Sequence, residues 1–312
     1  MKYIITLLFT LSVLTVSAQD VKIQGPKRQQ STVSKPKPKT SSGTQSRKPT
    51  APLRWDDSLK AICYDGQTYP MAFVEGGTFT MGEKYDNGKW FEHDTERYGD
   101  KRSDNSVLVS STLHNYYIGK FEVTQELWEK VMGSNPTQTE QKKYGSFPAE
   151  FVGKRKPITE VSTGEIRQFL SKLNNITGMI FRLPTEEQWE FAAIGGNKSQ
   201  SFKYSGSNSL NSVGWYSENS GGAIHEVGQK APNELGIYDM SGNVLEICSD
   251  EYGYKKLPGG TYRIVYDNVL RGGAYSWPME ECSISYRFNF DSDDIRSRGW
   301  YGIGFRIVLS DE

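Results

Sequence analysis

The feature that most constrains the fold of this chain is its shortage of long periodic segments. Apolar residues recur at helical spacing in only three short stretches, and beyond Gly196 short apolar runs alternate with loops rich in Gly, Ser and Asn. Such a chain cannot satisfy its buried peptide groups through long hydrogen-bonded ladders, so side-chain contacts must serve many of them. The pattern predicts an α+β domain with much irregular backbone.

Local signals place the regular elements. Residues 71–82 read as strand, turn and strand, and residues 107–124 are rich in β-branched and aromatic residues that favour extended structure. Gly178 and Gly195–Gly196 stop the second and third predicted helices. The helix start signals are Thr124, the Ser162–Glu165 capping box and the Thr185–Gln188 capping box.

The first 19 residues predict export. Lys2 supplies a basic start, residues 4–16 form an apolar run that is short for a membrane span, and Ser17–Ala18 provide small residues for cleavage. No Cys near that point could carry a lipid anchor. We therefore expect a signal peptide over 1–19 and a periplasmic, cell-surface or secreted protein without a membrane span.

Residues 20–55 are basic and almost devoid of apolar side chains. They hold nine Lys and Arg residues and one acidic residue, together with many Pro, Ser and Thr. Such a segment cannot bury enough surface to offset its chain entropy, so we predict a disordered linker that acts as a tether or contacts an acidic partner. The whole chain has 37 basic and 37 acidic residues, so the predicted domain over 56–312 is net acidic. We expect no nucleic-acid partner.

Seven motifs that occur in order carry a family resemblance. They are VEGGTFTMG, YYIGKFEVTQELWEKVMG, PITEVSTGEIRQFLSKLN, FRLPTEEQWEFAA, NELGIYDMSGNVLEI, VLRGG and GIGFRIV. Together they resemble the formylglycine-generating enzyme and sulfatase-modifying-factor family, and the resemblance runs from about Tyr69 to Val308. That resemblance implies a variant of the C-type lectin fold with little regular secondary structure.

The family does not have a single function. It includes oxidases that convert a sulfatase cysteine to formylglycine, and iron enzymes that form C–S bonds. It also includes variable ligand-binding proteins and structural parts of gliding and secretion machinery. The iron enzymes need three histidines, whereas His93, His114 and His225 of this chain lack metal-like spacing.

The oxidase members hold Cu(I) with two cysteines just after a Gly-Gly turn. Aligning Gly272–Gly273 with that turn puts Trp277 at the first cysteine position and Cys282 at the second. An indole is a poor copper ligand, so we do not expect a copper site. The resemblance suggests instead a disulfide between Cys248 and Cys282, with Cys63 free; reduced or separately buried thiols are the alternative.

One calcium loop of the family has a counterpart in YDMSGNVLE. The resemblance assigns the side chains of Asp239 and Glu246 and the backbone carbonyls of Gly242 and Val244 as ligands. Calcium prefers several oxygen ligands of these kinds. The alternative is a metal-free turn in which Asp239 caps local amides.

The segment between the Gly-Gly turn and GFR lies on the ligand face of the lectin-like fold. Aromatic anchors mixed with charges are typical of recognition surfaces. The alternative is that about half of these aromatics fill the core. Arg271, Arg287 and Arg306 are expected to form structural ion pairs or backbone contacts. The residues predicted for the binding surface are Tyr275, Trp277, Tyr286, Arg287, Asp291 and Trp300.

These observations predict an exported, non-catalytic binding or assembly module, in effect a pseudoenzyme. Its partner would be a protein, a glycan or a small ligand on the lectin-like face, and secretion or gliding machinery is one source of such partners. The alternatives are an oxidase acting through Cys282 alone and a variable ligand-display protein.

Overall fold

The computed structural model describes residues 51–82, 109–139, 149–251, 254–256, 262–264, 268–290 and 302–310. The chain divides into two units, Met1–Arg47 and Lys48–Glu312, and all of the described residues belong to the second. The predicted signal peptide and most of the predicted linker lie outside the described residues. Within these residues, no helix has both the length and the apolarity needed to cross a membrane.

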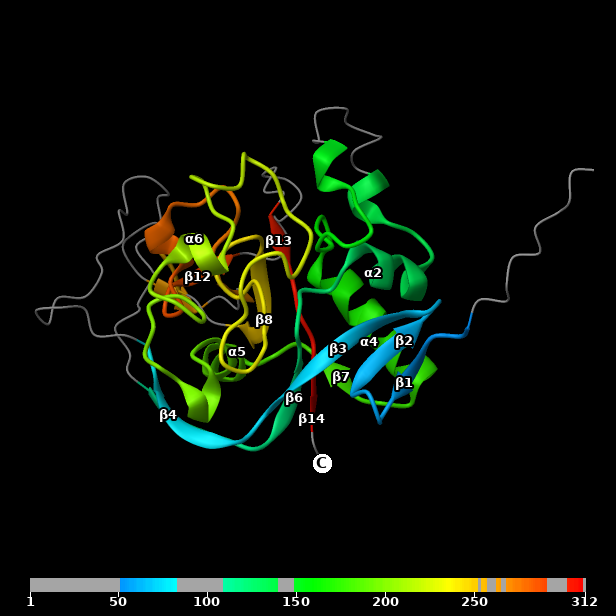
Figure 1. Ribbon diagram of the computed structural model, residues 1–312, viewed down its shortest axis with the longest axis horizontal. Coiled ribbons are helices and arrows are strands. Elements are labelled where there is room, and N and C mark those ends of the chain that lie inside the picture. The colour runs from blue at the N-terminus through cyan, green and yellow to red at the C-terminus, as the bar shows by residue number, and fades with distance from the viewer. Residues whose placement is uncertain are drawn as a thin grey trace, which may run out of the picture. The chain divides into compact units, whose positions relative to one another are not determined.

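A six-stranded antiparallel sheet joins the two ends of the described chain (Figure 1). Its order is β1-β2-β3-β6-β14-β7, so the C-terminal strand lies between β6 and β7. The edge strands β1 and β7 approach each other through Trp55 and Phe181, whose ring centroids are 5.8 Å apart, so the sheet is strongly curled. The strands are β1 (Arg54–Asp56), β2 (Ala61–Tyr64), β3 (Gln67–Val74), β6 (Tyr116–Gly119), β7 (Phe181–Arg182) and β14 (Val308–Ser310).

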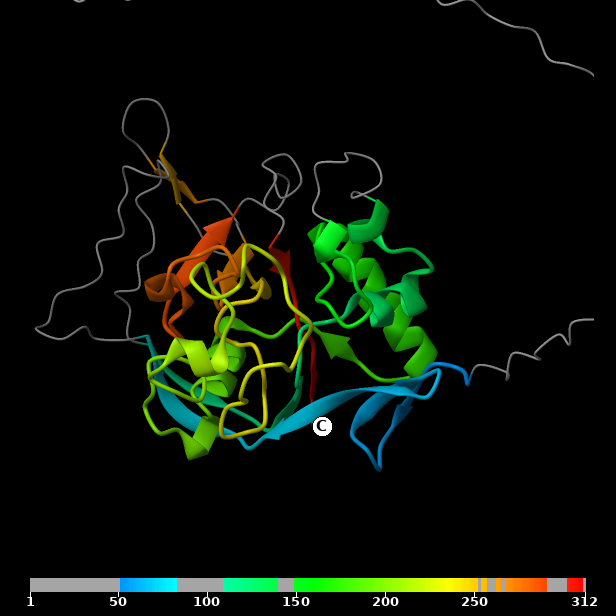
Figure 2. The ribbon, with the colours of Figure 1, turned by 45° about the horizontal axis from the view of Figure 1, so that its top comes forward.

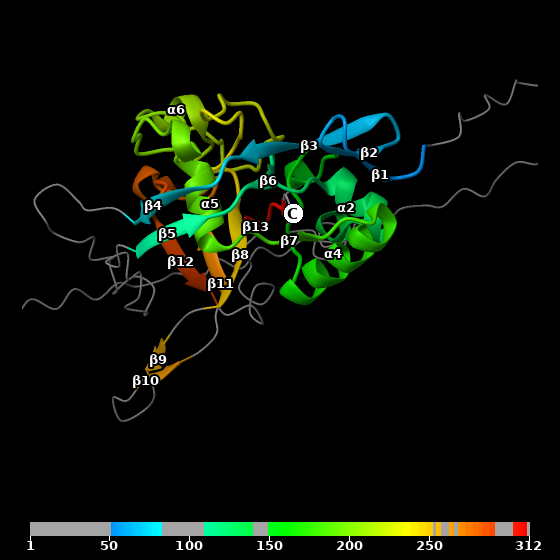
Figure 3. The same cartoon turned by 90° about the horizontal axis from the view of Figure 1, so that it is seen from below.

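A four-stranded sheet and two hairpins complete the β-structure. The sheet has the order β12-β11-β8-β13, and its β8–β13 pair is parallel. Figure 3 shows the β9–β10 hairpin projecting from the end of β8 and β11. The sheet strands are β8 (Leu245–Glu251), β11 (Asn268–Arg271), β12 (Arg287–Phe290) and β13 (Ile303–Gly304); the hairpin strands are β4 (Gly77–Met81), β5 (Val109–Leu113), β9 (Tyr254–Lys256) and β10 (Tyr262–Ile264).

The predicted helix signals are confirmed. The Thr124 hydroxyl accepts a hydrogen bond from the Leu127 amide, and both predicted capping boxes form. Gly178 ends the longest helix in the left-handed conformation. The helices are α2 (Gln125–Met132), α4 (Thr163–Thr177), α5 (Glu186–Ala193) and α6 (Leu210–Val213), and the 3-10 turns are η1 (Ala149–Phe151), η2 (Gly196–Lys198) and η3 (Met279–Cys282).

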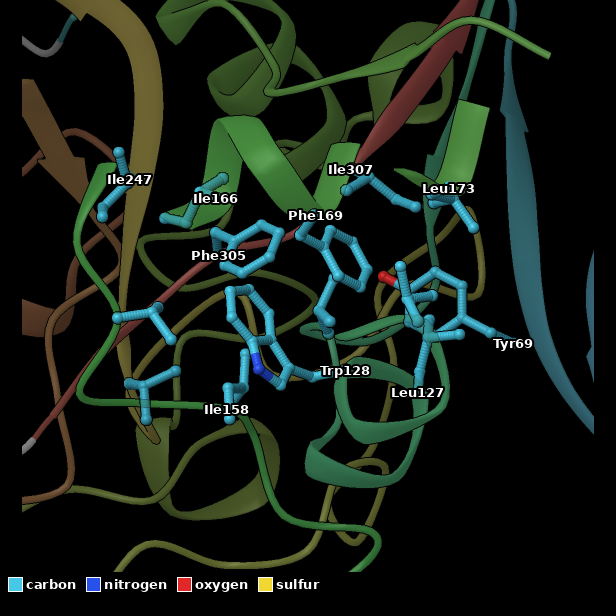
Figure 4. Packing of buried hydrophobic residues seen from close by; sticks show 14 of the residues in the cluster. Tyr69, Leu127, Trp128, Ile158, Ile166, Phe169, Leu173, Ile247, Phe305 and Ile307 are labelled. Atoms are coloured by element: carbon cyan, nitrogen blue, oxygen red, sulfur yellow. The ribbon is translucent and has the colours of Figure 1, made fainter. Parts of the chain in front are cut away.

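Three aromatic side chains organise the largest hydrophobic cluster (Figure 4). Trp128 of α2 stacks on Phe169 of α4, with ring centroids 5.0 Å apart, and Phe305 packs edge-on against both. These side chains are almost fully buried. They join the α2–α4 pair to the chain between β13 and β14, so residues from the middle and the end of the sequence share one core.

Helix α5 links the β4–β5 ribbon to the four-stranded sheet, since it contacts β4 and β5 as well as β8 and β11 (Figure 2). Trp189, Ala192 and Ala193 are fully buried in a second cluster. The mixture of short helices and short strands confirms the predicted α+β class. The contacts between α5 and β11 also fix where the segment after β11 begins.

Candidate functional site around the Gly272–Gly273 turn

The chain turns sharply at Gly272–Gly273, directly after β11. Both residues have positive φ, 92° and 72°. A Cβ on Gly273 would lie 2.5 Å from the Glu281 carbonyl oxygen and 2.6 Å from Cys282 Sγ. Only glycine fits where the turn approaches η3 so closely. The turn therefore fixes the position of Cys282.

Cys282 is a buried thiol in an apolar pocket. Its side chain is 0% exposed and packs in a third cluster with Tyr204, Leu210, Val213 and Tyr216. Burial raises the pKa of this thiol to about 12, and the nearby carboxylates of Glu281 and Glu280 act in the same direction. The thiol is therefore protonated at neutral pH, whereas copper ligation and nucleophilic attack require the thiolate.

Trp277 stands five residues before Cys282, at the position that aligns with the first cysteine of the oxidases. Its indole is partly exposed and packs edge-on against Tyr286 and Phe288, at centroid distances of 6.0 and 5.3 Å. Its backbone amide donates to the Ala274 carbonyl oxygen, and its carbonyl accepts from Ser217. These contacts hold Trp277 as part of a rigid surface segment.

Several residues predicted for the binding surface are instead buried. Tyr275 packs against Phe151, and it is 9% exposed, whereas Tyr286 is 5% exposed. Tyr275 lies in the turn after β11 and Tyr286 directly precedes β12, so both aromatic side chains fill the core without being part of a strand. Asp291 and Trp300 lie outside the described residues. What remains at the surface is the short segment Ser276–Glu280, which we call the Trp277 ledge.

The three family-like arginines form buried ion pairs, as expected. Arg287 forms a two-point ion pair with Glu186 of α5, so its place in the predicted binding surface needs correction. Arg271 pairs with Glu190 and lies 3.2 Å from Glu186. These pairs connect α5 to β11 and β12, and their guanidinium groups are occupied by the carboxylates of α5.

Arg306 forms the most deeply buried ion pair. Its Nε and its terminal nitrogen each lie 2.6 Å from an oxygen of Glu246, and both side chains are 0% exposed. Trp189 Nε1 donates to the same carboxylate over 2.7 Å. Both oxygens of Glu246 thus accept hydrogen bonds from protein donors, and its role as a calcium ligand stays a prediction.

Asp239 has the opposite character. Its Oδ2 accepts from the Gly228 amide at 2.6 Å, whereas its Oδ1 is buried with no hydrogen-bond partner. Burial raises the pKa of this carboxyl to about 6. The residue has a left-handed φ of 59°, which suits a tight loop. An unpartnered buried carboxylate oxygen is a position that a cation can satisfy.

Glu122 is a buried acid that the sequence interpretation did not single out. Its Oε1 accepts from Asn243 Nδ2 at 3.0 Å, and its Oε2 has no hydrogen-bond partner. Burial, then the charges of Asp239 and Glu246, raise its pKa well above the usual range. The sequence signal that could have identified Glu122 is a single acidic residue between the aromatic and β-branched residues of KFEVT. In the described part of the chain, no group of three or more His, Cys, Asp or Glu side chains is arranged to hold a metal.

The suggested disulfide is absent from the structure. Cys63, Cys248 and Cys282 are all free thiols. Cys248 lies on β8 in the cluster beside α5, whereas Cys282 lies in the third cluster. The two apolar environments separate the thiols, so the suggested Cys248–Cys282 pairing is corrected to two separately buried thiols.

Comparisons with known proteins define the family. Residues 63–311 match the family model described as a sulfatase-modifying factor enzyme 1-like domain, also named FGE-sulfatase. The chain therefore belongs to the FGE-sulfatase family.

Three relatives illustrate its range. The protein named chaperone protein LppX of Paenibacillus barcinonensis is 32% identical over 77% of this chain and 89% of its own length. The protein named inactive C-alpha-formylglycine-generating enzyme 2 of Bos taurus is 30% identical over 31% of this chain and 33% of its own length. The structure of Treponema denticola variable protein 1 is 26% identical, with a TM-score of 0.58 over 80% of this chain and 98% of that one. The last supports the C-type-lectin-like fold.

Proposed function

We propose that this protein is an exported, non-catalytic member of its family that binds a protein partner through the Trp277 ledge. The observation that carries the proposal is the environment of Cys282. One deeply buried thiol faces an apolar cluster, and an indole stands where the oxidases have their first cysteine. A two-thiolate copper site cannot be assembled from these groups.

The Trp277 ledge has the physical character of a recognition surface. Trp277 and Met279 are partly exposed, and Ser276, Pro278 and Glu280 are exposed. The Glu281 amide bonds the Pro278 carbonyl and the Trp277 amide bonds Ala274, so the segment is held in one conformation. A rigid aromatic anchor loses little entropy on binding, which favours it as an interface centre.

Two relatives support this interpretation. LppX is named a chaperone and matches over most of both chains, and the bovine relative is named an inactive enzyme. A binding role without oxidase chemistry therefore agrees with the names of both relatives. The apolar run at residues 4–16 supports export.

The catalytic alternative is tested by incubating the purified protein with copper and a peptide containing Cys-x-Pro-x-Arg. We expect no aldehyde by mass spectrometry, because Cys282 is protonated and lacks a second thiolate. Aldehyde formation that disappears in Cys282→Ser would overturn the proposal, and a known active oxidase provides the positive control.

The partner is tested by placing a photo-crosslinking amino acid at Met279 and, as a matched control, at the 75% exposed Ile180. A discrete adduct should form at position 279 only. The partner protein in that adduct is then purified. Its Kd for wild type is compared with its Kd for Trp277→Ala. A Kd that Trp277→Ala leaves unchanged contradicts the ledge as the binding site.

We further propose that Asp239 contributes to a calcium site. The support is its buried, unpartnered Oδ1 near the second unpartnered carboxylate, Glu122. A bound cation would neutralise these acids, whereas Glu246 stays with Arg306. Chelator should lower the melting temperature of wild type and leave Asp239→Asn unaffected. Equal melting curves of wild type with calcium and with chelator contradict this site.

A further inference from the structure

Strands β3 to β6 form a long bent hairpin that has an outward face. Strand β3 continues into β4 and strand β5 into β6, so Val74 pairs with Tyr116 and Gly77 pairs with Leu113. Between these pairs the ladder is interrupted. The Gly76 amide donates to Asn115 Oδ1 at 2.9 Å, and its carbonyl accepts from Asn197 at 3.0 Å. Two side chains thus replace main-chain pairing at the bend.

The hairpin has one covered and one open face. Val74, Phe79, Leu113 and Tyr116 belong to or pack against the cluster around α5, which covers one face. Their neighbours in the strands consequently point away from α5. The open face is separate from the Trp277 ledge, which follows β11 on the four-stranded sheet.

An aromatic pair lies on the open face beside the bend. Phe73 and Tyr117 are cross-strand partners with ring centroids 5.3 Å apart, and Phe73 is 44% exposed. Phe73 is one of four large apolar side chains exposed among the described residues. The two rings are tilted by 54°, and the Lys60 ammonium lies 5.4 Å from the Tyr117 ring centroid, so Phe73 supplies the exposed aromatic surface.

A hollow that is wide open to solvent lies on the other side of the bend. Its volume is about 480 Å³. The Thr78 and Thr112 hydroxyl groups lie 2.8 Å apart, and both side chains are exposed. A Cβ at Gly76 would lie 2.4 Å from the Leu113 carbonyl oxygen, so the glycine allows the strands to close there. The lining residues are Gly76, Gly77, Thr78, Thr112, Leu113, His114 and Asn115.

The chemistry of this lining selects a class of ligand. Among the described residues around the hollow, none carries a carboxylate, an ammonium or a guanidinium group. Hydroxyl, amide and imidazole groups can both donate and accept hydrogen bonds, as sugar hydroxyls do. Thr78 lies five residues from Phe73, at most about 16 Å along an extended strand. We propose that the open face binds a neutral oligosaccharide, with Phe73 stacking on one sugar and Thr78 and Thr112 forming hydrogen bonds to another.

The test uses the full chain displayed on streptavidin, to raise avidity, against an array of neutral and acidic glycans. Neutral oligosaccharides should be retained, and calorimetry with the best of them should give a Kd that rises at least tenfold in Phe73→Ala. Thr78→Val, which removes one hydroxyl at nearly constant volume, should raise the Kd at least threefold.

Matched controls separate binding from folding. Thr80→Val is exposed on β4 outside the hollow, and Ile180→Ala removes an exposed apolar side chain elsewhere. Both should bind within twofold of wild type, and all four variants should melt near the wild-type temperature. Retention of acidic glycans alone, retention of no neutral glycan, or unchanged binding by Phe73→Ala and Thr78→Val overturns the proposal.

Discussion

At the scale of single residues, the buried polar groups differ in the partners that surround them. Cys282 has the sequence position of a catalytic thiol, but its pocket keeps it protonated. Asp239 and Glu122 are buried acids with unpartnered oxygens, whereas Glu246 is satisfied by Arg306 and Trp189. The same residue types therefore take different states because their partners differ.

The thiol environments predict a labelling pattern. Native protein treated with iodoacetamide at pH 8 should be modified at Cys63, which is partly exposed, and spared at the buried Cys248 and Cys282. In urea without reductant, all three should react, as peptide mass spectrometry can show. If Cys248 and Cys282 react in urea only after reduction, they are bridged and the free-thiol description is wrong.

The Asp239 carboxyl predicts a pH dependence of stability. Its folded-state pKa of about 6 exceeds the unfolded value, so the folded protein retains a proton that the unfolded chain releases. This contribution is complete below the unfolded pKa, near 4, and is lost as pH rises through 6. In the presence of chelator, the free energy of unfolding of wild type should therefore fall relative to that of Asp239→Asn by about 2 kcal/mol between pH 4 and 7.

Urea unfolding at several pH values measures this difference. Asp57→Asn is the control, because a hydrogen bond from Lys60 lowers the pKa of that exposed carboxyl and no gain is expected. Parallel pH profiles for wild type and Asp239→Asn would contradict the assignment.

At the scale of elements, local sequence signals and packing act together. The caps of α2, α4 and α5 form as predicted, because a cap involves residues within one turn. The position of each helix depends on distant partners, such as Phe305 against Trp128.

The capping box of α4 predicts a measurable stability effect. Ser162→Ala removes the acceptor for the Glu165 amide and should lower the free energy of unfolding by about 1 kcal/mol. Ser171→Ala, exposed in the middle of the same helix, should cost nothing, because alanine has the higher helix propensity. Equal losses in the two variants, measured by urea unfolding, would show that the cap contributes nothing specific.

At the scale of the whole described fold, buried ion pairs connect the sheets. Arg306, which precedes β14, bonds Glu246 on β8 and also donates to the Gly119 carbonyl at the end of β6. One side chain therefore contacts both the four-stranded and the six-stranded sheet. Such a pair stabilises only while both partners are present.

Removing one partner should be costly. Arg306→Met leaves the Glu246 charge buried and should lower the free energy of unfolding by about 3–5 kcal/mol. The double variant with Glu246→Met should recover part of that loss. Lys154→Met breaks an exposed pair with Glu126 and should cost less than about 1 kcal/mol. A double variant with the same free energy of unfolding as Arg306→Met alone would contradict the buried-charge explanation.

The sequence by itself determined the elements and the family. Caps, glycine stops and alternating strands depend on neighbours within a few residues, and the order of motifs identified the fold. The resemblance also placed Trp277 where the oxidases have their first copper ligand. The tertiary structure alone decided the separate burial of Cys248 and Cys282, the engagement of Glu246 by Arg306 and the interior position of Tyr275 and Tyr286. Burial and partner choice depend on residues far apart in the sequence, so no local pattern could specify them.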